Sequence, residues 1–238
     1  PAMSRIQHVT VTPIAFLDPP LLNAAGVHEP WCLRSIVELH VEGGVVGLGE
    51  TYGDELILGY LNAVAPLLEG VDVFDFAGIR RQVAVAIKAV HRPGGAASPR
   101  TSEDTLAARI FSPFEVAALD AIGKRIGKRV CDLLGGPVRE SIEFSAYLFY
   151  KFGRHRFSEQ AIDDPWGEVT TPEAVVEEAR RMVALHGFRS LKLKGGVFEP
   201  AHEVACMQAL AKAFPGLPLR LDPNANWSLA ASIAAAPA

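Results

Sequence analysis

The sequence lacks several features that mark whole classes of protein. Its 238 residues include only three cysteines, and no two of them form a CxxC pattern, so neither a disulfide framework nor a zinc cluster is indicated. No run of about 18 apolar residues occurs, which argues against a membrane-spanning helix. The net charge of −4 and the pI of about 6.0 lack the basic excess of nucleic-acid-binding proteins. We therefore expect neither a nucleic acid nor a membrane as a partner.

Two further absences concern location and architecture. Residues 1–11 contain no apolar signal-peptide core, and the cysteines are odd in number, so we expect a cytoplasmic protein with reduced thiols. Internal repeats are missing, and the only biased stretch is the alanine-rich one at residues 230–238. The rest is an ordinary globular composition, 49% hydrophobic and 21% charged, in a chain long enough for one large or two ordinary domains.

The first half of the chain favours an α+β domain. Strands are predicted by β-branched residues and alternation, over residues 5–17, 33–41 and 45–50. We expect an interruption of the first strand at Pro13 and a hairpin turn at Gly43-Gly44. Helices are predicted by apolar spacing and capping residues, over residues 54–68, 75–90 and 112–126. The third is expected to begin at Ser112-Pro113, because an N-cap residue followed by proline is typical of a helix start.

Residues 18–31 are predicted to form a loop because they are rich in proline and glycine. The Leu21-Leu22 pair is unusually apolar for a solvated loop. Such loops often fold over a binding site, so this segment is a candidate lid.

Gly135-Gly136-Pro137 is the clearest boundary in the sequence, and we expect two domains, residues 1–136 and 137–238. After this boundary, strands and helices alternate. The strands are predicted over residues 141–147, 188–194 and 218–222, with helices capped at Thr170, spanning 199–214 and beginning at Ser228. This alternation predicts βαβ units and a parallel sheet.

Two of these strands end in charged residues. Lys192 and Lys194 share one strand face while the leucines take the other, and Asp222 ends the next strand. Solvated lysines and a turn-forming aspartate are the simplest alternatives. A βαβ sheet is normally covered on both faces, however, and a buried like-charge pair favours the neutral amine that a general base needs. Asp222 is then a candidate ligand for a divalent metal, with Asn224 beside it.

Taken together, the motifs resemble those of the enolase superfamily, and within it the glucarate dehydratases. Residues 192–196 (KLKGG) look like that group's KxKGG strand, and residues 222–224 (DPN) look like its metal-ligand segment. The other matching segments are residues 134–139 (LGGPVR), 47–51 (GLGET) and 18–23 (DPPLLN) with His28. The resemblance runs over essentially the whole chain. It implies an α+β capping domain followed by an α/β domain that is an incomplete (β/α) TIM-type barrel.

The resemblance also implies a reaction. Mg²⁺ held partly by Asp222 would grip the carboxylate of an aldarate, D-glucarate or a stereoisomer. Lys194 would remove the α-proton, Lys192 would stabilise the enediolate, and loss of the β-hydroxyl would give a 4-deoxy-5-keto aldarate. The resemblance implies substrate contacts from His28, Thr101, Tyr147, Asn224 and Asn23. The expected class is a lyase, a hydro-lyase acting on acid sugars, and relatives suggest a homo-oligomer.

The sequence departs from the family pattern at its end. A complete barrel needs roughly 250 residues, but only about a hundred follow Gly135, so the family's other metal ligands and its His–Asp pair have no positions here. Ala225 also stands where the family usually has glycine. Three explanations stay open: an incomplete piece of a longer chain, a short protein completed by another chain, or a catalytically incompetent relative acting as a binding or assembly partner.

Overall fold

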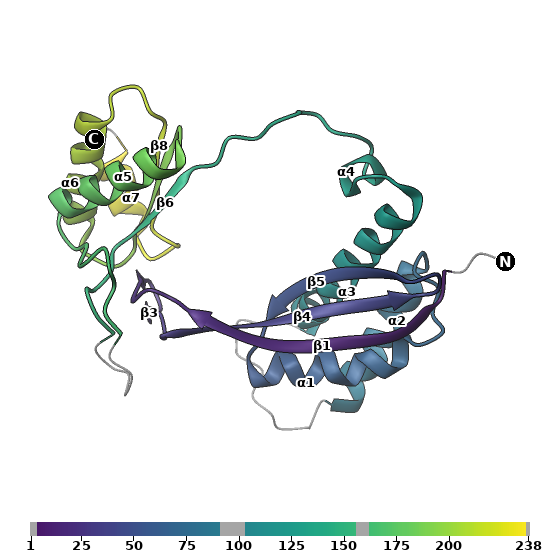
Figure 1. Ribbon diagram of the computed structural model, residues 1–238. Coiled ribbons are helices and arrows are strands. Elements are labelled where there is room, and N and C mark those ends of the chain that lie inside the picture. Colours follow the sequence, from purple (N-terminus) through teal and green to yellow (C-terminus); the bar gives the residue numbers. More distant parts are fainter. Residues whose placement is uncertain (1–3, 91–102, 156–161, 237–238) are drawn as a thin grey trace. The chain divides into compact units, whose positions relative to one another are not determined.

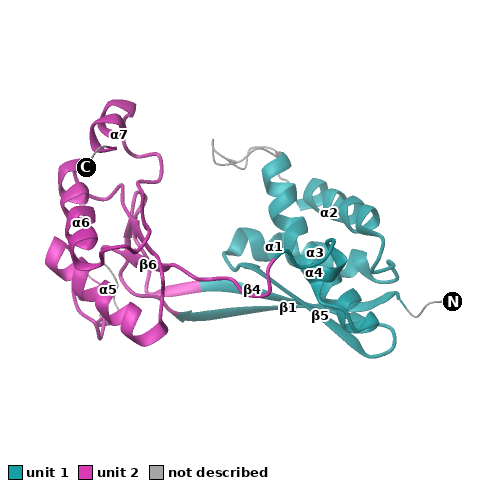
Figure 2. Cartoon of the chain, turned by 90° about the horizontal axis from the view of Figure 1, so that it is seen from above, with its two compact units in different colours: residues 1–16, 33–138 teal, residues 17–32, 139–238 magenta. Residues whose placement is uncertain are grey.

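The computed structural model describes residues 4–90, 103–155 and 162–236 (Figure 1). The chain divides into two compact units, residues 1–16 with 33–138 and residues 17–32 with 139–238 (Figure 2). The division at Val138–Arg139 lies two residues beyond the boundary predicted at Gly136. The candidate lid segment belongs to the second unit although it comes early in the chain.

The first unit contains a three-stranded sheet in the order β1-β4-β5, formed by β1 (Ile6–Leu17), β4 (Trp31–Val41) and β5 (Val45–Tyr52). The Gly43-Gly44 hairpin is confirmed: both glycines have positive φ angles, 85° and 79°. The predicted interruption at Pro13 is wrong, because β1 runs through it. Since β1 is an edge strand in this sheet, the missing N–H of Pro13 does not break an interior ladder.

Helices of the first unit pack against this sheet. They are α1 (Glu55–Val64), the 3₁₀ turn η1 (Ala65–Leu68), α2 (Phe76–Val90), α3 (Glu103–Ile126) and α4 (Val130–Leu133). Asp54 caps α1 as expected, accepting a hydrogen bond of 3.1 Å from the Ile57 amide. The predicted helix start at Ser112-Pro113 is wrong, since Pro113 lies inside α3. Buried Phe111 and Phe114 on either side of it anchor the helix in the core, which offsets the lost hydrogen bond.

The lid segment is more ordered than a loop. It contains a two-stranded antiparallel ribbon, β2 (Leu22–Asn23) and β3 (Gly26–Val27). Leu22 is buried in the core of the second unit, and its amide donates to the Tyr150 carbonyl at 2.8 Å. The His155 side chain contacts the Asp18 carbonyl oxygen at 2.8 Å. Leu22 thus anchors the segment to the core of the second unit.

The second unit is built on a parallel sheet in sequence order, β6 (Ala146–Phe149), β7 (Leu191–Lys194) and β8 (Leu219–Asp222). The helices are α5 (Pro172–His186), α6 (Pro200–Ala213) and α7 (Leu229–Ala235). The predicted strand–helix alternation is confirmed. Several bounds are corrected: the first strand spans Ala146–Phe149, not residues 141–147, and the second begins at Leu191, not residue 188. Thr171, not Thr170, caps α5, because its Oγ1 accepts a hydrogen bond from the Ala174 amide.

The sheet presents two different faces because side chains alternate along a strand. Leu191 and Leu193 are fully buried, and they share a core with Leu148 of β6 and with Val175 and Leu210 from helices α5 and α6. The opposite face carries the polar residues of the predicted site. None of the helices in the described ranges is long and apolar enough to cross a membrane.

Candidate active site

The carboxyl ends of β7 and β8 bring the two lysines and the aspartate together as predicted. Lys194 and Asp222 are register partners in adjacent parallel strands. One oxygen of Asp222, Oδ2, lies 3.0 Å from Lys192 Nζ and 3.1 Å from Lys194 Nζ. The side chains of Lys192, Lys194 and Asp222 are 25%, 12% and 32% exposed, so the cluster is shielded but open to a ligand.

The electrostatics differ from the expectation based on a like-charge pair. Hydrogen bonds from Lys192, from the Asn224 amide and from Lys194 hold the pKa of Asp222 well below its usual range. The hydrogen bond to Asp222 in turn raises the pKa of Lys192 above its ordinary value. The expected neutral amine is therefore not favoured at Lys192, because Asp222 lies between the lysines as a shared counter-ion.

The backbone after β8 turns sharply to bring Asn224 to the same place. The side-chain oxygen Oδ1 of Asn224 accepts a hydrogen bond of 2.9 Å from Lys194 Nζ, and the backbone N–H of Asn224 donates to Asp222 Oδ1 at 3.0 Å. Asn224 and Ala225 have φ angles of 53° and 58°, in the left-handed region. Asparagine tolerates this region, whereas alanine is strained there. The strain at Ala225 gives a physical reason why glycine suits this position.

Tyr147 joins the cluster from the neighbouring strand β6. Its ring lies 4.5 Å from Lys192 Nζ, a cation–π contact, and the two residues are register partners. Two positions further on, Phe149 lies 4.5 Å from the Tyr147 ring. Phe149 was not predicted, although its spacing of two from Tyr147 places it on the same strand face.

His28 and Asn23 of the lid segment form a second, connected group. His28 Nδ1 lies 2.8 Å from Asp18 Oδ2, and His28 Nε2 lies 2.8 Å from Asn23 Nδ2. The imidazole and the Phe149 ring have an edge-to-face arrangement, with their centroids 6.1 Å apart. Phe149 thus links the lid residues to Tyr147. The remaining predicted substrate contact, Thr101, lies outside the described residues.

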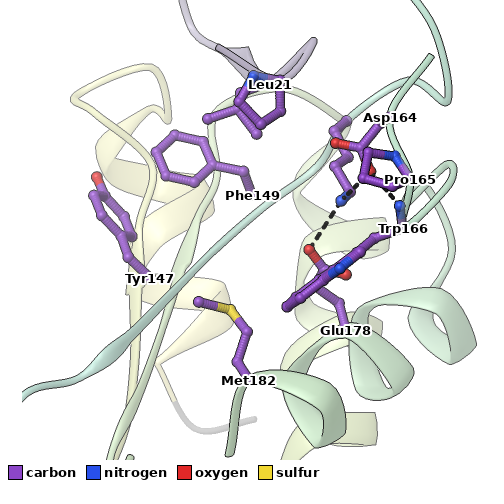
Figure 3. A pocket seen from close by; sticks show the side chains of 10 residues that line it. Leu21, Tyr147, Phe149, Asp164, Pro165, Trp166, Glu178 and Met182 are labelled. Atoms are coloured by element: carbon purple, nitrogen blue, oxygen red, sulfur yellow. Dashed lines mark hydrogen bonds and ion pairs between the residues drawn. The ribbon is translucent and has the colours of Figure 1, made fainter. Parts of the chain in front are cut away.

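A cavity of about 390 Å³ opens beside β6 and is lined mainly by apolar and aromatic groups, among them Tyr147 and Phe149 (Figure 3). Lys151 pairs there with Asp164 at 2.9 Å and with Glu178 at 3.0 Å, and all three side chains are at least nine-tenths buried. Neither strand-end lysine lines this cavity. We interpret the Lys151 ion pairs as a structural link between α5 and the segment that follows β6.

Glu203 is a further residue that the sequence interpretation missed. It is completely buried in α6, and its carboxylate accepts hydrogen bonds from the loops that follow β7 and β8. A signal was present in the sequence. Glu203 is three residues before Cys206 and seven before Leu210, both buried, so it occupies the core face of an amphipathic helix.

Comparison with known proteins agrees with the fold and the strand-end motifs. The family described as "Enolase C-terminal domain-like" matches residues 174–238. A probable glucarate dehydratase of Streptomyces coelicolor is 47% identical over 234 residues, which cover 96% of this chain and 54% of that protein. The resemblance to the enolase superfamily that the motifs predict is confirmed.

Solved structures show the same relationship. An enolase from Pseudomonas fluorescens with bound magnesium, potassium and tartrate has a TM-score of 0.89 at 47% identity, covering 98% of this chain and 55% of that one. An enolase from Gibberella zeae complexed with magnesium, formate and sulfate has a TM-score of 0.88 at 46% identity, covering 99% and 54%. The chain therefore spans about half the length of the relatives it matches.

Proposed function

We propose that this chain supplies one wall of the active site of a Mg²⁺-dependent aldarate dehydratase, a lyase. The observation that carries the proposal is that Lys192 and Lys194 both contact one carboxylate oxygen of Asp222, at the ends of adjacent parallel strands. The 47% identity to a probable glucarate dehydratase supports the reaction class. The substrate would be a six-carbon dicarboxylic sugar acid, D-glucarate or a stereoisomer.

In this proposal Lys194 is the general base. It is the less exposed of the two lysines and is held from two sides, by Asp222 and Asn224. Its Nζ would take the proton on the carbon next to the substrate carboxylate. The electron pair left behind would delocalise into that carboxylate, where the Lys192 ammonium stabilises the added negative charge. The C–O bond of the β-hydroxyl then breaks and the hydroxyl leaves as water, with a proton that balances the one taken by Lys194. The resulting enol tautomerises to the 4-deoxy-5-keto product.

Asp222 fits the role of a Mg²⁺ ligand in part. Carboxylate oxygens are preferred ligands of this ion, and Asp222 lies at the open end of the sheet. No group of three His, Cys, Asp or Glu side chains in the described part of the chain could hold a metal, so the other ligands would come from water, the substrate or residues beyond those described. When bound, Mg²⁺ would supply Lewis-acid stabilisation of the carboxylate. The magnesium in the two enolase structures above supports this assignment.

The remaining assignments concern binding and architecture. Tyr147 and Asn224 border the lysines and would contact the substrate directly, whereas His28 and Asn23 would contribute from the lid segment. Thr101 stays a predicted substrate contact. Tartrate, bound in the Pseudomonas enolase, is likewise a hydroxylated dicarboxylate. We further propose that residues 137–238 form the first βα units of a (β/α) barrel capped by residues 1–136, and that the protein is a cytoplasmic homo-oligomer.

A dehydration assay tests the proposal. The protein is incubated with D-glucarate and its stereoisomers, and the keto product is quantified by NMR, with Mg²⁺ and with EDTA. We expect activity that EDTA abolishes and Mg²⁺ restores, and a loss of at least about 10³-fold in Lys194→Ala, as for other essential bases. Lys212→Ala, a lysine of α6 that lies outside the site, is the matched control. Turnover that survives EDTA contradicts the metal role, and full activity in Lys194→Ala contradicts the base assignment.

A further inference from the structure

Glu203 carries an unusual concentration of hydrogen bonds for a buried acid. Its exposed fraction is 0%, and carboxylates are rarely buried unless every oxygen has partners. Oε2 accepts from the Gly196 amide at 2.9 Å and from Trp227 Nε1 at 3.1 Å. Oε1 accepts from the amides of Val197 and Phe198 at 2.9 and 3.0 Å. All four partners are N–H donors, and a carboxylate can accept from all of them because each of its oxygens has two acceptor sites.

The four donors come from two different loops. Residues 196–198 follow β7 and therefore follow Lys194, whereas Trp227 follows β8 and Asp222. Two further contacts join the same loops: the Gly195 amide donates to the Asp222 carbonyl at 2.9 Å, and Asn226 Nδ2 donates to the Gly196 carbonyl at 2.7 Å. The buried carboxylate thus connects the backbone on both sides of the candidate base and the candidate metal ligand.

The pair of glycines in the KLKGG motif is a consequence of this arrangement. A Cβ atom on Gly195 would overlap the Glu203 carboxylate, and one on Gly196 would overlap the Pro223 carbonyl. Gly196 also has a φ of 77°, which favours glycine. The motif therefore lets the backbone come close enough for its amides to reach Glu203.

We propose that Glu203 is a positioning residue, which sets the distance between Lys194 and Asp222 by tying the loops after β7 and β8 to one buried carboxylate. The proposal rests on the function proposed above for those two residues. Glu203 does not contact them itself and takes no proton from the substrate. A displacement of about 1 Å at a reacting group can cost about 100-fold in rate, so we expect the effect of Glu203 to appear in kcat more than in KM.

The substitution Glu203→Gln tests this sharply, because it changes one atom and keeps the shape. Glutamine has one acceptor oxygen and one NH₂ group, and either orientation points the NH₂ at two N–H donors. We expect kcat to fall about 10- to 100-fold with KM changed less than about threefold. Glu199→Gln is the matched control: it removes the same charge from the exposed N-cap position of α6, where the side chain makes no capping hydrogen bond, and should leave kcat unchanged.

NMR gives a readout that does not depend on activity. The chain has three tryptophans, so the Trp227 indole N–H can be assigned by comparison with Trp227→Phe. In Glu203→Gln we expect this resonance to shift and its hydrogen exchange to accelerate at least about tenfold, because its acceptor is lost. The backbone amide resonances of Gly195 and Asn224 show whether the change at Glu203 reaches the site. These amides donate hydrogen bonds to the Asp222 carbonyl and to Asp222 Oδ1, respectively. Both should shift in Glu203→Gln and not in Glu199→Gln.

The outcomes separate the two proposals. If the wild-type protein does not dehydrate aldarates but the Gly195 and Asn224 amides shift, the proposed reaction fails and the positioning role stands. If those amides stay in place, or if an active enzyme keeps its kcat in Glu203→Gln, the positioning role is refuted. Should Glu203→Gln not fold, Trp227→Phe removes one of the four donors and keeps the carboxylate. It should still shift the Gly196 and Gly195 amides, and unchanged shifts there would overturn the proposal.

Discussion

The shared contact of two lysines with Asp222 makes a prediction about stability that needs no substrate. Asp222→Asn keeps the size of the side chain and can keep its contact with the Asn224 amide. It removes the negative charge from between the ammonium groups of Lys192 and Lys194. Because each Nζ lies about 3 Å from the same oxygen, the two nitrogens are at most about 6 Å apart. The variant therefore combines the loss of two attractions with an uncompensated repulsion.

The size of the effect follows from the partial exposure of the cluster. Ion pairs on a protein surface contribute about 0.2–1 kcal/mol each, and the 32% exposure of Asp222 places these pairs near the upper end of that range. Two unit positive charges 6 Å apart repel by about 0.7 kcal/mol at the dielectric constant of water, and more in a less polar environment. We expect Asp222→Asn to lower the free energy of unfolding by about 1–3 kcal/mol at pH 7.

The pH dependence carries a definite sign. The folded-state pKa of Asp222 is lowered, so its contribution is present above the unfolded pKa of about 3.9 and is lost as the pH falls toward the folded value. The folded-state pKa of Lys192 is raised, so its contribution is present below the unfolded pKa of about 10.4 and is lost as the pH rises through the folded value. The difference between wild type and variant should therefore be flat from about pH 5 to 9 and shrink on both sides.

Urea unfolding followed by tryptophan fluorescence measures this difference in the relevant unit. Trp166 and Trp227 lie within the second unit, and Trp31 begins β4 at the junction of the two units, so the signal reports mainly the second unit. Asp163→Asn is the matched control, because Asp163 is 77% exposed and lies 3.5 Å from an exposed arginine; it should cost less than about 0.5 kcal/mol. Equal stabilities of Asp222→Asn and wild type at pH 7, or a difference that persists unchanged at pH 3, would refute the reasoning.

Two further predictions follow from the backbone. Ala225→Gly should stabilise the second unit by about 0.5–1 kcal/mol in the same urea experiment, because the relief of a left-handed alanine exceeds the entropy cost of glycine; a loss of stability would contradict the strain at φ 58°. Gly49→Ala should destabilise the first unit by at least about 2 kcal/mol, measured by circular dichroism, because its Cβ would overlap the Pro113 carbonyl of α3. Its control is Gly59→Ala in α1, where an added Cβ would meet no atom within 4 Å, and we expect a gain in stability of about 0.5–1 kcal/mol. Equal effects of the two substitutions would refute the close approach of β5 and α3.

Strand faces and the parallel sheet could be predicted because they depend on local geometry. Successive side chains of an extended chain point to opposite faces because of covalent geometry. The placement of Leu191 and Leu193 on one face and of the two lysines on the other therefore needs no tertiary information. The alternation of strand and helix then implies parallel pairing. Lys194 and Asp222 meet because parallel strands end at the same edge of the sheet, as the pairing of β7 with β8 shows.

The errors arise where tertiary structure overrides a local rule. Ser112-Pro113 has the residues of a helix start, yet α3 begins at Glu103, because buried side chains before and after the proline keep the helix in the core. The charge state of the site could not be predicted from the sequence either. Two lysines two residues apart suggest repulsion, whereas the register of β7 and β8 places an aspartate between them, and register is a property of the folded sheet.

In the proposed reaction Asp222 has two kinds of partner, the two lysines and a divalent cation. In the structure Oδ2 is the shared counter-ion of Lys192 and Lys194, and Oδ1 holds the Asn224 amide. If Asp222 also binds a divalent cation, as proposed, the cation would compete with the two lysines for the charge of the carboxylate, which would favour the neutral amine that proton abstraction requires. The base would then become active only when the electrophile that stabilises its product is in place. Glu203 supports this exchange, because it fixes the two strand ends independently of the Asp222 side chain, and the carboxylate can change partners without moving the backbone.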